Sequence, residues 1–99
     1  MHVRDKVILI TGGAGGLGIE MAKVLADGGA KVYLLDLNEE SGKRAEAQLA
    51  NLAGTVKFLQ MDITNEEAWK QVVATVVAEQ GRIDVLVNNA GINIRKPIE

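Results

Sequence analysis

Five glycines fall within the seven positions 12–18, directly after the apolar run at residues 7–10. A glycine-rich turn between a strand and a helix can bring its backbone against a pyrophosphate, and the N–H groups at the helix start attract the anion. In that arrangement Gly12 takes the sharp turn after the strand, Gly16 faces the phosphates, and Gly18 lets the helix pack closely. The alternative is a flexible turn that binds nothing, in which so many glycines would be an entropic burden without a task. The segment is not a P-loop, because no lysine follows its last glycine.

An acidic residue, Asp36, ends the second apolar run, 18 positions after Gly18. Its carboxylate can accept hydrogen bonds from the ribose hydroxyls of NAD, whereas the 2′-phosphate of NADP would meet a like charge. At ~4 Å and an effective dielectric constant near 20, that repulsion is about 4 kcal/mol per pair of unit charges. We therefore predict NAD as the cofactor, with a turn or cap role as the alternative for Asp36.

Further polar motifs follow the third and fourth apolar segments. Asp62 and Ile63 come after the third segment, and Asn-Asn-Ala-Gly at 88–91 comes after the fourth. Because ligands of open α/β sheets bind at the carboxyl ends of the strands, we expect these motifs to share one edge with the glycine turn. Asp62 is equally suited to a turn before the next helix, and Asn88 to bracing the sheet.

Regularly alternating elements must position these motifs. Apolar runs predict strands at 7–10, 32–35, 55–58 and 85–87. Between them, apolar residues recur at helical spacing in three stripes: Leu17, Met21, Val24, Leu25 and Gly28; Ala45, Leu49, Leu52 and Ala53; Trp69, Val72, Val73, Val76 and Val77. Such alternation predicts parallel pairing through right-handed crossovers. We therefore predict an α/β fold, βαβαβαβ, with a four-stranded parallel sheet of order 3-2-1-4, which is half of a doubly wound Rossmann fold.

Capping residues and glycines mark the predicted helix ends. Asn38 can cap the second helix, and Thr64 with Glu67 forms a capping box for the third. Glycines that can end the three helices stand at 28–29, 54 and 81. No linker or repeat interrupts the chain, so residues 1–99 are predicted to form one domain, with 92–99 interpreted as loop.

These motifs together resemble the N-terminal half of the short-chain dehydrogenases/reductases. The resemblance rests on Thr-Gly-x-x-x-Gly-x-Gly at 11–18, Asp36, Asp62-Ile63 and the turn at 88–91, and it extends over residues 6–91. It implies NAD contacts from Gly12, Gly15, Gly16, Leu17, Gly18, Asp36, Asp62, Ile63, Asn89, Ala90 and Gly91. It also implies that Asp62 and Ile63 bracket the adenine, and that the turn at 88–91 lines the nicotinamide-side ribose. The stretch 91–97 is similar to relatives that act on sugar acids, such as gluconate dehydrogenases.

The catalytic residues implied by the resemblance are missing from the sequence. The family uses a Ser and a Tyr-x-x-x-Lys pair, in which the lysine charge lowers the pKa of the tyrosine hydroxyl. The one tyrosine, Tyr33, is followed four positions later by Leu37, and the one serine is Ser41. We therefore expect no catalytic residue and no activity from these 99 residues alone. Two hypotheses remain: an NAD-binding module of an oxidoreductase, or a folding and assembly unit that binds cofactor weakly. A piece of a longer enzyme is a further possibility.

Composition and charge exclude several classes of function. A net charge of −2 without a basic cluster gives no footprint for nucleic acid or an anionic membrane. The absence of cysteine excludes disulfides and thiolate metal sites, and His2 is interpreted as a terminal residue rather than a metal ligand. No leader segment or membrane-length apolar run is recognisable, so we expect a cytoplasmic protein with no metal site.

The predicted topology leaves an apolar strand at one edge of the sheet. In the order 3-2-1-4 the run at 85–87 has no neighbour on its outer side, and natural proteins seldom leave such an edge bare. We therefore expect a homodimer formed through this edge or through exchange of the segment after Gly91.

Overall fold

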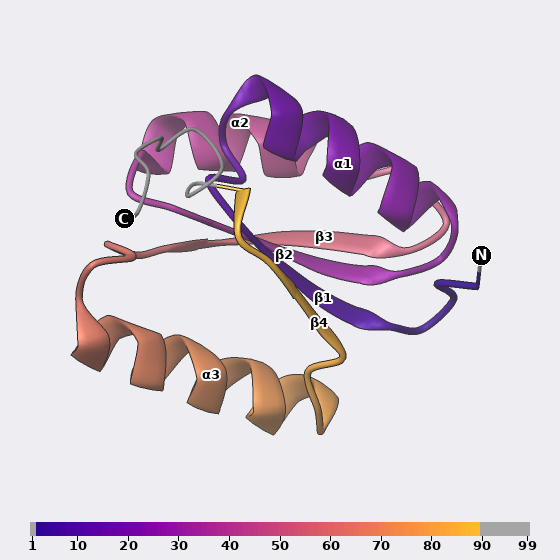
Figure 1. The fold of residues 1–99 in the computed structure, drawn as a ribbon. Coiled ribbons are helices and arrows are strands. Elements are labelled where there is room, and N and C mark those ends of the chain that lie inside the picture. The colour runs from indigo at the N-terminus through magenta and orange to yellow at the C-terminus, as the bar shows by residue number, and fades with distance from the viewer. Residues whose placement is uncertain (1, 90–99) are drawn as a thin grey trace, which may run out of the picture.

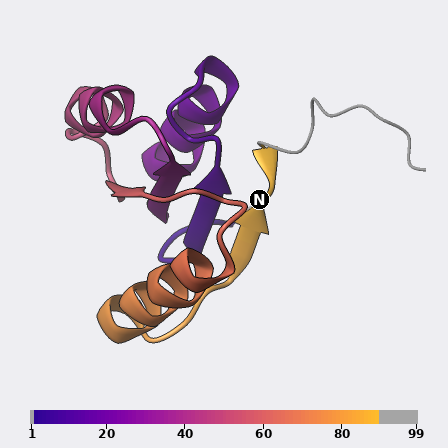
Figure 2. The same ribbon diagram turned by 90° about the vertical axis from the view of Figure 1, so that its left-hand side faces the viewer.

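A computed structural model describes residues 2–89; Ala90, Gly91 and the predicted loop at 92–99 lie outside the described residues. Seven elements follow one another in the predicted order: β1 (Val7–Thr11), α1 (Gly16–Asp27), β2 (Lys31–Asp36), α2 (Glu39–Gln48), β3 (Thr55–Gln60), α3 (Glu66–Gln80) and β4 (Val85–Val87). The strands form one parallel sheet of order β3-β2-β1-β4, which confirms the predicted α/β topology. Helices α1 and α2 cover one face of the sheet and α3 covers the other (Figures 1 and 2).

The central strands β1 and β2 are buried on both faces, as their continuous apolar runs predicted. Every residue of β1 is buried. Ile8 and Leu34 belong to the core beneath α1 and α2, whereas Leu9 and Leu35 belong to the core beneath α3. In β3, buried and exposed residues alternate over its first four positions, as expected for a strand at the sheet edge.

The predicted apolar stripe of α1 is confirmed only in part, because Met21 and Leu25 pack against the core but Leu17 and Val24 do not. The helix is buried through its small residues Gly18, Ala22 and Ala26, while Leu17 is 59% and Val24 is 69% exposed. Residues spaced by four positions lie on one face, and the small side chains of Ala22 and Ala26 let the helix axis come close to the sheet. Met21 and Leu25 pack beside these small residues and are partly buried.

The predicted capping box of α3 is wrong by one residue. The N-cap is Asn65, whose side-chain oxygen accepts a hydrogen bond from the N–H of Ala68 at 3.0 Å. Thr64 instead donates its hydroxyl to Oδ1 of Asp62 at 2.6 Å. Asn38 caps α2 as predicted, accepting from the N–H of Ser41 at 3.0 Å.

Only part of the predicted stripe of α3 is buried. Val72 and Val76 pack against the sheet, whereas Val73 and Val77 are 40% and 42% exposed. Trp69 is half-buried against the same core and donates its indole N–H to the carbonyl of Ile63 at 2.8 Å. The interpretation of Trp69 as a packing residue is therefore confirmed.

The one tyrosine is committed to holding α3 on the sheet. Tyr33 is buried in β2 and donates its hydroxyl to the Glu79 carboxylate at 2.5 Å, while Gln80 donates to the same hydroxyl at 3.0 Å. Burial raises the pKa of Tyr33, and the Glu79 carboxylate raises it further. The hydrogen bond from Tyr33, followed by that from Lys57, lowers the pKa of Glu79. This hydroxyl is therefore held neutral inside a packing contact.

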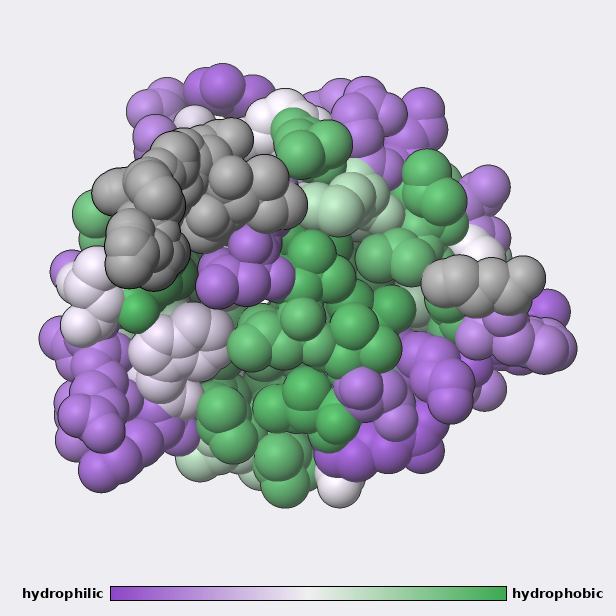
Figure 3. Space-filling model, in the orientation of Figure 1, coloured by the Kyte–Doolittle hydropathy of each residue, from purple (hydrophilic) through white to green (hydrophobic). Residues whose placement is uncertain are grey.

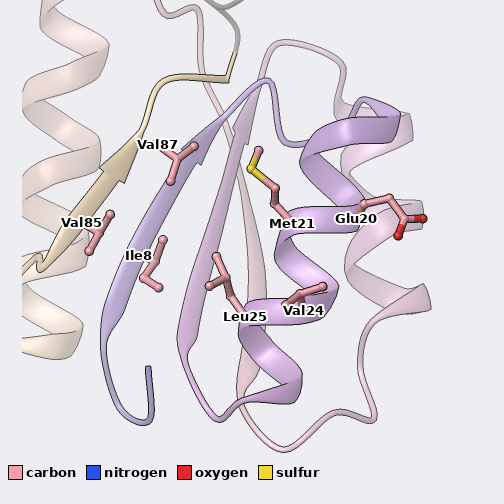
Figure 4. A pocket seen from close by; sticks show the side chains of 7 residues that line it. All are labelled: Ile8, Glu20, Met21, Val24, Leu25, Val85 and Val87. Carbon is pink, nitrogen blue, oxygen red and sulfur yellow. The ribbon is translucent and has the colours of Figure 1, made fainter. Parts of the chain in front are cut away.

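The sheet edge along β4 has no neighbouring strand among residues 2–89, and it exposes apolar side chains on both faces of the sheet. Val85 is 44% and Leu86 is 52% exposed. Figure 3 shows the resulting apolar area running from α1 across β4 to α3. Between α1 and β4 it deepens into a groove of about 480 Å³, lined by Ile8, Glu20, Met21, Val24, Leu25, Val85 and Val87 (Figure 4). We call this area the β4 edge surface.

Candidate functional site

The glycine turn follows β1 with the geometry that its sequence predicted. Gly12 has φ +67°, in the left-handed region that favours glycine. The N–H of Gly13 donates to the carbonyl of Leu35 at 3.2 Å, and the N–H of Gly15 donates to the carbonyl of Gly12 at 3.2 Å. The turn is thus closed on itself and attached to the end of β2.

Gly18 and Gly16 differ sharply in the space around them. A Cβ on Gly18 would lie 2.5 Å from the Gly12 oxygen and 2.9 Å from the Gly13 Cα. The close packing predicted for Gly18 is therefore made against the glycine turn itself rather than against the sheet. A Cβ on Gly16 would meet no heavy atom within 4 Å, so this position faces open space.

The start of α1 has no side-chain cap. Its N-cap is Gly15, and no acidic residue stands in its first turn, whereas α2 and α3 each carry an Asn cap and two glutamates there. The first N–H groups of a helix have no partner within the helix, and its dipole places partial positive charge at this end. The α1 terminus therefore offers N–H donors and positive potential to an anion.

The Asp36 carboxylate accepts backbone hydrogen bonds from two segments, the glycine turn and the residues that follow β2. Its Oδ2 accepts a hydrogen bond from the N–H of Ala14 at 3.1 Å, and its Oδ1 accepts one from the N–H of Asn38 at 3.0 Å. The turn role considered for this residue is thus present in the structure. Ala14 was not among the predicted site residues, because a backbone donor leaves no mark on residue type.

Beside Asp36 lies a pocket of about 230 Å³, lined by Gly12, Asp36, Leu37, Met61, Asp62 and Ile63. Pockets for whole small ligands usually measure about 300–1,000 Å³, so this one has room for a single ring-sized group. The structure thus brings together four predicted site residues from the ends of three strands. Leu37 and Met61 were not among the predicted site residues, because the residue type of neither one marks it as part of a pocket wall.

Asp62 is held in place by its neighbour Thr64. The Thr64 N–H and hydroxyl both donate to Oδ1 of Asp62, at 2.9 and 2.6 Å. The hydroxyl bond, and then the N–H bond, lower the pKa of Asp62. This carboxylate is therefore charged at neutral pH, and Oδ2 keeps its capacity to accept a further hydrogen bond.

The end of β4 is fastened to the end of β1. The buried Asn89 donates its side-chain amide to the carbonyl of Gly12 at 3.2 Å. The Thr11 hydroxyl lies 3.1 Å from Oδ1 of Asn88 and 3.4 Å from the carbonyl of Val87. Asn88 braces the sheet as predicted, and Asn89 does so as well. The other two residues of the Asn-Asn-Ala-Gly turn lie outside the described residues.

The described part of the chain brings hydrogen-bonding groups together at this site. Within residues 2–89, no three His, Asp or Glu side chains are placed to hold a metal ion. No helix in that range is long and apolar enough to cross a membrane. At the carboxyl ends of the strands, the site offers the uncapped start of α1, the Asp36 carboxylate and the pocket beside it.

Comparisons with known proteins agree on one family. The sequence profile described as short chain dehydrogenase matches residues 6–99. Cyclopentanol dehydrogenase of Comamonas testosteroni is 50% identical over 98 residues, which is 99% of this chain and 39% of that protein. The human 15-hydroxyprostaglandin dehydrogenase [NAD(+)] is 42% identical over 98 residues, covering 97% of this chain and 37% of that enzyme.

Solved structures give the same result. A short chain dehydrogenase from Mycobacterium smegmatis superposes with a TM-score of 0.84 at 37% identity, over 97% of this chain and 41% of the other. NAD+-bound xylitol dehydrogenase superposes with a TM-score of 0.81 at 36% identity, over 87% of this chain and 33% of the other. The chain therefore spans less than half the length of each of these relatives.

Proposed function

The chain belongs to the short-chain dehydrogenase family, and on that premise we propose that it is the NAD(H)-binding part of an oxidoreductase. The observation that carries this proposal is the position of Asp36, whose carboxylate lies between the glycine turn and the 230 Å³ pocket. Two relatives support the choice of cofactor, since one is described as an NAD(+) dehydrogenase and another was solved with NAD+ bound.

The residues present fit the parts of this cofactor. The open position at Gly16 and the uncapped start of α1 suit the pyrophosphate, because a Cβ would fill that space. Asp36 suits the adenine-side ribose hydroxyls, and the pocket beside Ile63 suits the adenine, with Asp62 as acceptor for its amino group. Of the remaining predicted contacts, Gly12, Gly15, Leu17 and Gly18 belong to the glycine turn and the start of α1, and Asn89, Ala90 and Gly91 would serve the nicotinamide side.

Bound NAD supplies a hydride acceptor, and the rest of the chemistry would come from residues outside these 99. The hydroxyl of Tyr33 is already engaged, since it donates to Glu79 and accepts from Gln80. We therefore propose that the chain alone binds cofactor without turnover. For the whole protein we propose that the substrate is an alcohol, which is oxidised to its carbonyl product. The relatives include dehydrogenases named for cyclopentanol and xylitol.

The cofactor preference is testable by titration. We expect the chain to bind NADH at least about tenfold more tightly than NADPH, since a repulsion of ~1.4 kcal/mol already gives that ratio. The variant Asp36→Asn removes the charge and should reduce the ratio between the dissociation constants for NADPH and NADH. Fluorescence titration with both nucleotides measures the two dissociation constants. The control is Glu39→Gln, which removes a charge of the same sign outside the pocket lining. It should leave the ratio of the two dissociation constants unchanged. Equal affinities in the wild type would contradict the preference.

The alternative function, a folding and assembly unit, is favoured by a different observation. The β4 edge surface exposes apolar side chains on both faces of the sheet beside a strand edge without a partner among the described residues. Such an edge is a template for pairing with another chain. We propose that in the isolated 99-residue chain a second copy occupies it, giving a dimer. A dissociation constant for NADH beyond several millimolar would favour this function over cofactor binding.

Sedimentation equilibrium tests the dimer. We expect a species of twice the chain mass of 10.6 kDa at micromolar concentration, since burial of ~800 Å² per partner supports a specific complex. Leu86→Gln should shift the equilibrium to monomer. Leu37→Gln is the matched control, because Leu37 is similarly exposed (63% against 52%) but lies at the pocket instead of the edge. A wild-type monomer with a cooperative thermal transition would refute self-association.

A further inference from the structure

We propose that Asp36 is a positioning residue for the glycine turn as well as a ligand for ribose, so that one carboxylate links the two halves of the nucleotide site. This inference rests on the proposed NAD(H) function and extends it.

Three consecutive N–H groups of the turn have partners within the protein. That of Gly13 donates to the carbonyl of Leu35, that of Ala14 to Oδ2 of Asp36, and that of Gly15 to the carbonyl of Gly12. Two of these three acceptors belong to the last two residues of β2. The end of β2 therefore fixes the turn, and the Ala14 bond is the only one of the three that a side chain supplies.

The same carboxylate is itself oriented by the backbone. Oδ1 of Asp36 accepts from the N–H of Asn38 while Oδ2 accepts from Ala14. Bonds on both oxygens fix the plane of the group, because a rotation that improved one bond would break the other. Each carboxylate oxygen has two lone pairs, so ribose hydroxyls can donate to Asp36 while the turn stays bound.

The turn needs such a fastening because of its composition. Glycine loses more conformational freedom on ordering than any other residue, and five stand within positions 12–18. A turn that is ordered before the ligand arrives spares that loss at the moment of binding. The N–H groups at the start of α1, beginning at Gly16, remain available to phosphate only if the turn before them keeps its shape.

Diphosphate probes separate the two roles of Asp36. ADP carries both ribose hydroxyls, whereas 2′,3′-dideoxy-ADP carries neither, so Asp36 has nothing on its sugar to accept from. If Asp36 acts only on the ribose, Asp36→Ala leaves dideoxy-ADP binding unchanged, or strengthens it by removing a negative charge near the diphosphate. If Asp36 holds the turn, the same variant weakens dideoxy-ADP binding, by an expected threefold or more. Unchanged or tighter binding would overturn the proposal.

A second variant separates geometry from charge. Asp36→Asn lacks the charge but keeps an oxygen that can accept from the N–H of Ala14, so it should bind dideoxy-ADP at least as well as the wild type. Weakening of the same size in both variants would contradict the positioning role. Thermal unfolding of both variants shows whether any weaker binding of dideoxy-ADP comes from a loss of folded protein.

Amide NMR on the ligand-free chain tests the fastening without any nucleotide. In Asp36→Ala the resonances of Ala14, Gly15 and Gly16 should move and their heteronuclear NOE should fall. Leu37→Ala, which changes a neighbouring pocket residue without a side-chain bond to the turn, should leave them in place. Unmoved turn resonances in Asp36→Ala refute the positioning role alone, whereas a wild-type chain that fails to bind ADP refutes the proposed function.

Discussion

Replacing Gly16 with alanine is expected to weaken NADH binding at least tenfold while leaving the chain fully folded. A Cβ at this position would meet no protein atom within 4 Å, so the fold has no reason to resist it. Gly16 is also the first residue of α1, where alanine is the better helix former by up to ~1 kcal/mol. The added methyl would instead occupy the space proposed for the pyrophosphate. Fluorescence titration and thermal unfolding of the same preparation measure the two effects.

Gly18→Ala is the matched comparison for this variant. Its Cβ would lie 2.5 Å from the Gly12 oxygen, so we expect a lower melting temperature together with weaker binding. Loss of affinity with intact stability in one variant, and loss of both in the other, would locate the ligand at the open glycine. Wild-type affinity in Gly16→Ala would mean that the nucleotide does not approach this part of the turn.

Gly54→Ala is expected to give the largest loss of stability of any variant described here, about 3 kcal/mol or more. Its Cβ would lie 2.0 Å from the Ala30 oxygen and 2.8 Å from the Gly29 carbonyl carbon. Both atoms are backbone, so rotation of a side chain cannot relieve the overlap, and costs at or above the upper end of overpacking follow. The N–H of Gly54 also donates to the Ala26 carbonyl at 2.7 Å, which holds the residue in place. Urea unfolding monitored by circular dichroism measures the change.

The neighbouring Asn51→Ala is the control for this loss. Asn51 is exposed, and substitutions at such positions usually change the free energy of unfolding by no more than about 0.5 kcal/mol. Because small domains are stable by only ~5–15 kcal/mol, the loss in Gly54→Ala would be a large fraction of the total. Equal urea midpoints for the two variants would show that β3 can shift away from the turn before β2.

The strand order could be predicted from the sequence because its signals are regular. Apolar runs at a steady spacing, each separated by a helical pattern, allow few parallel topologies once crossovers are right-handed. The buried face of α1 could not be read in the same way. A hydropathy pattern follows large apolar residues such as Leu17 and Val24, whereas close packing selected Gly18, Ala22 and Ala26.

In the candidate site, some residues could be predicted from their residue type and others could not. Gly12 and Asp36 carry signals in residue type, since one needs a left-handed backbone and the other a charge at a strand end. Ala14 and Met61 carry none, because one acts through its backbone N–H and the other through its position in the pocket wall. The start of α3 shows a third kind of limit: Thr64 and Asn65 are adjacent and both can cap a helix, so the choice between them depended on the Asp62 turn.

The pairing of β1 has a consequence for the order in which the sheet assembles. Leu9 of β1 pairs with Tyr33 on one side and with Leu86 on the other, so its two neighbours come from very different distances along the chain. Closing the longer loop costs more entropy, and the β1–β4 ladder has three residue pairs against five between β1 and β2. We expect β1, β2 and β3 to form the early, slowly exchanging unit and β4 to join last and open first, an order that amide hydrogen exchange would show. Since Asn89 reaches Gly12 from the end of that strand, one wall of the proposed nucleotide site would then be completed only in the final step of folding.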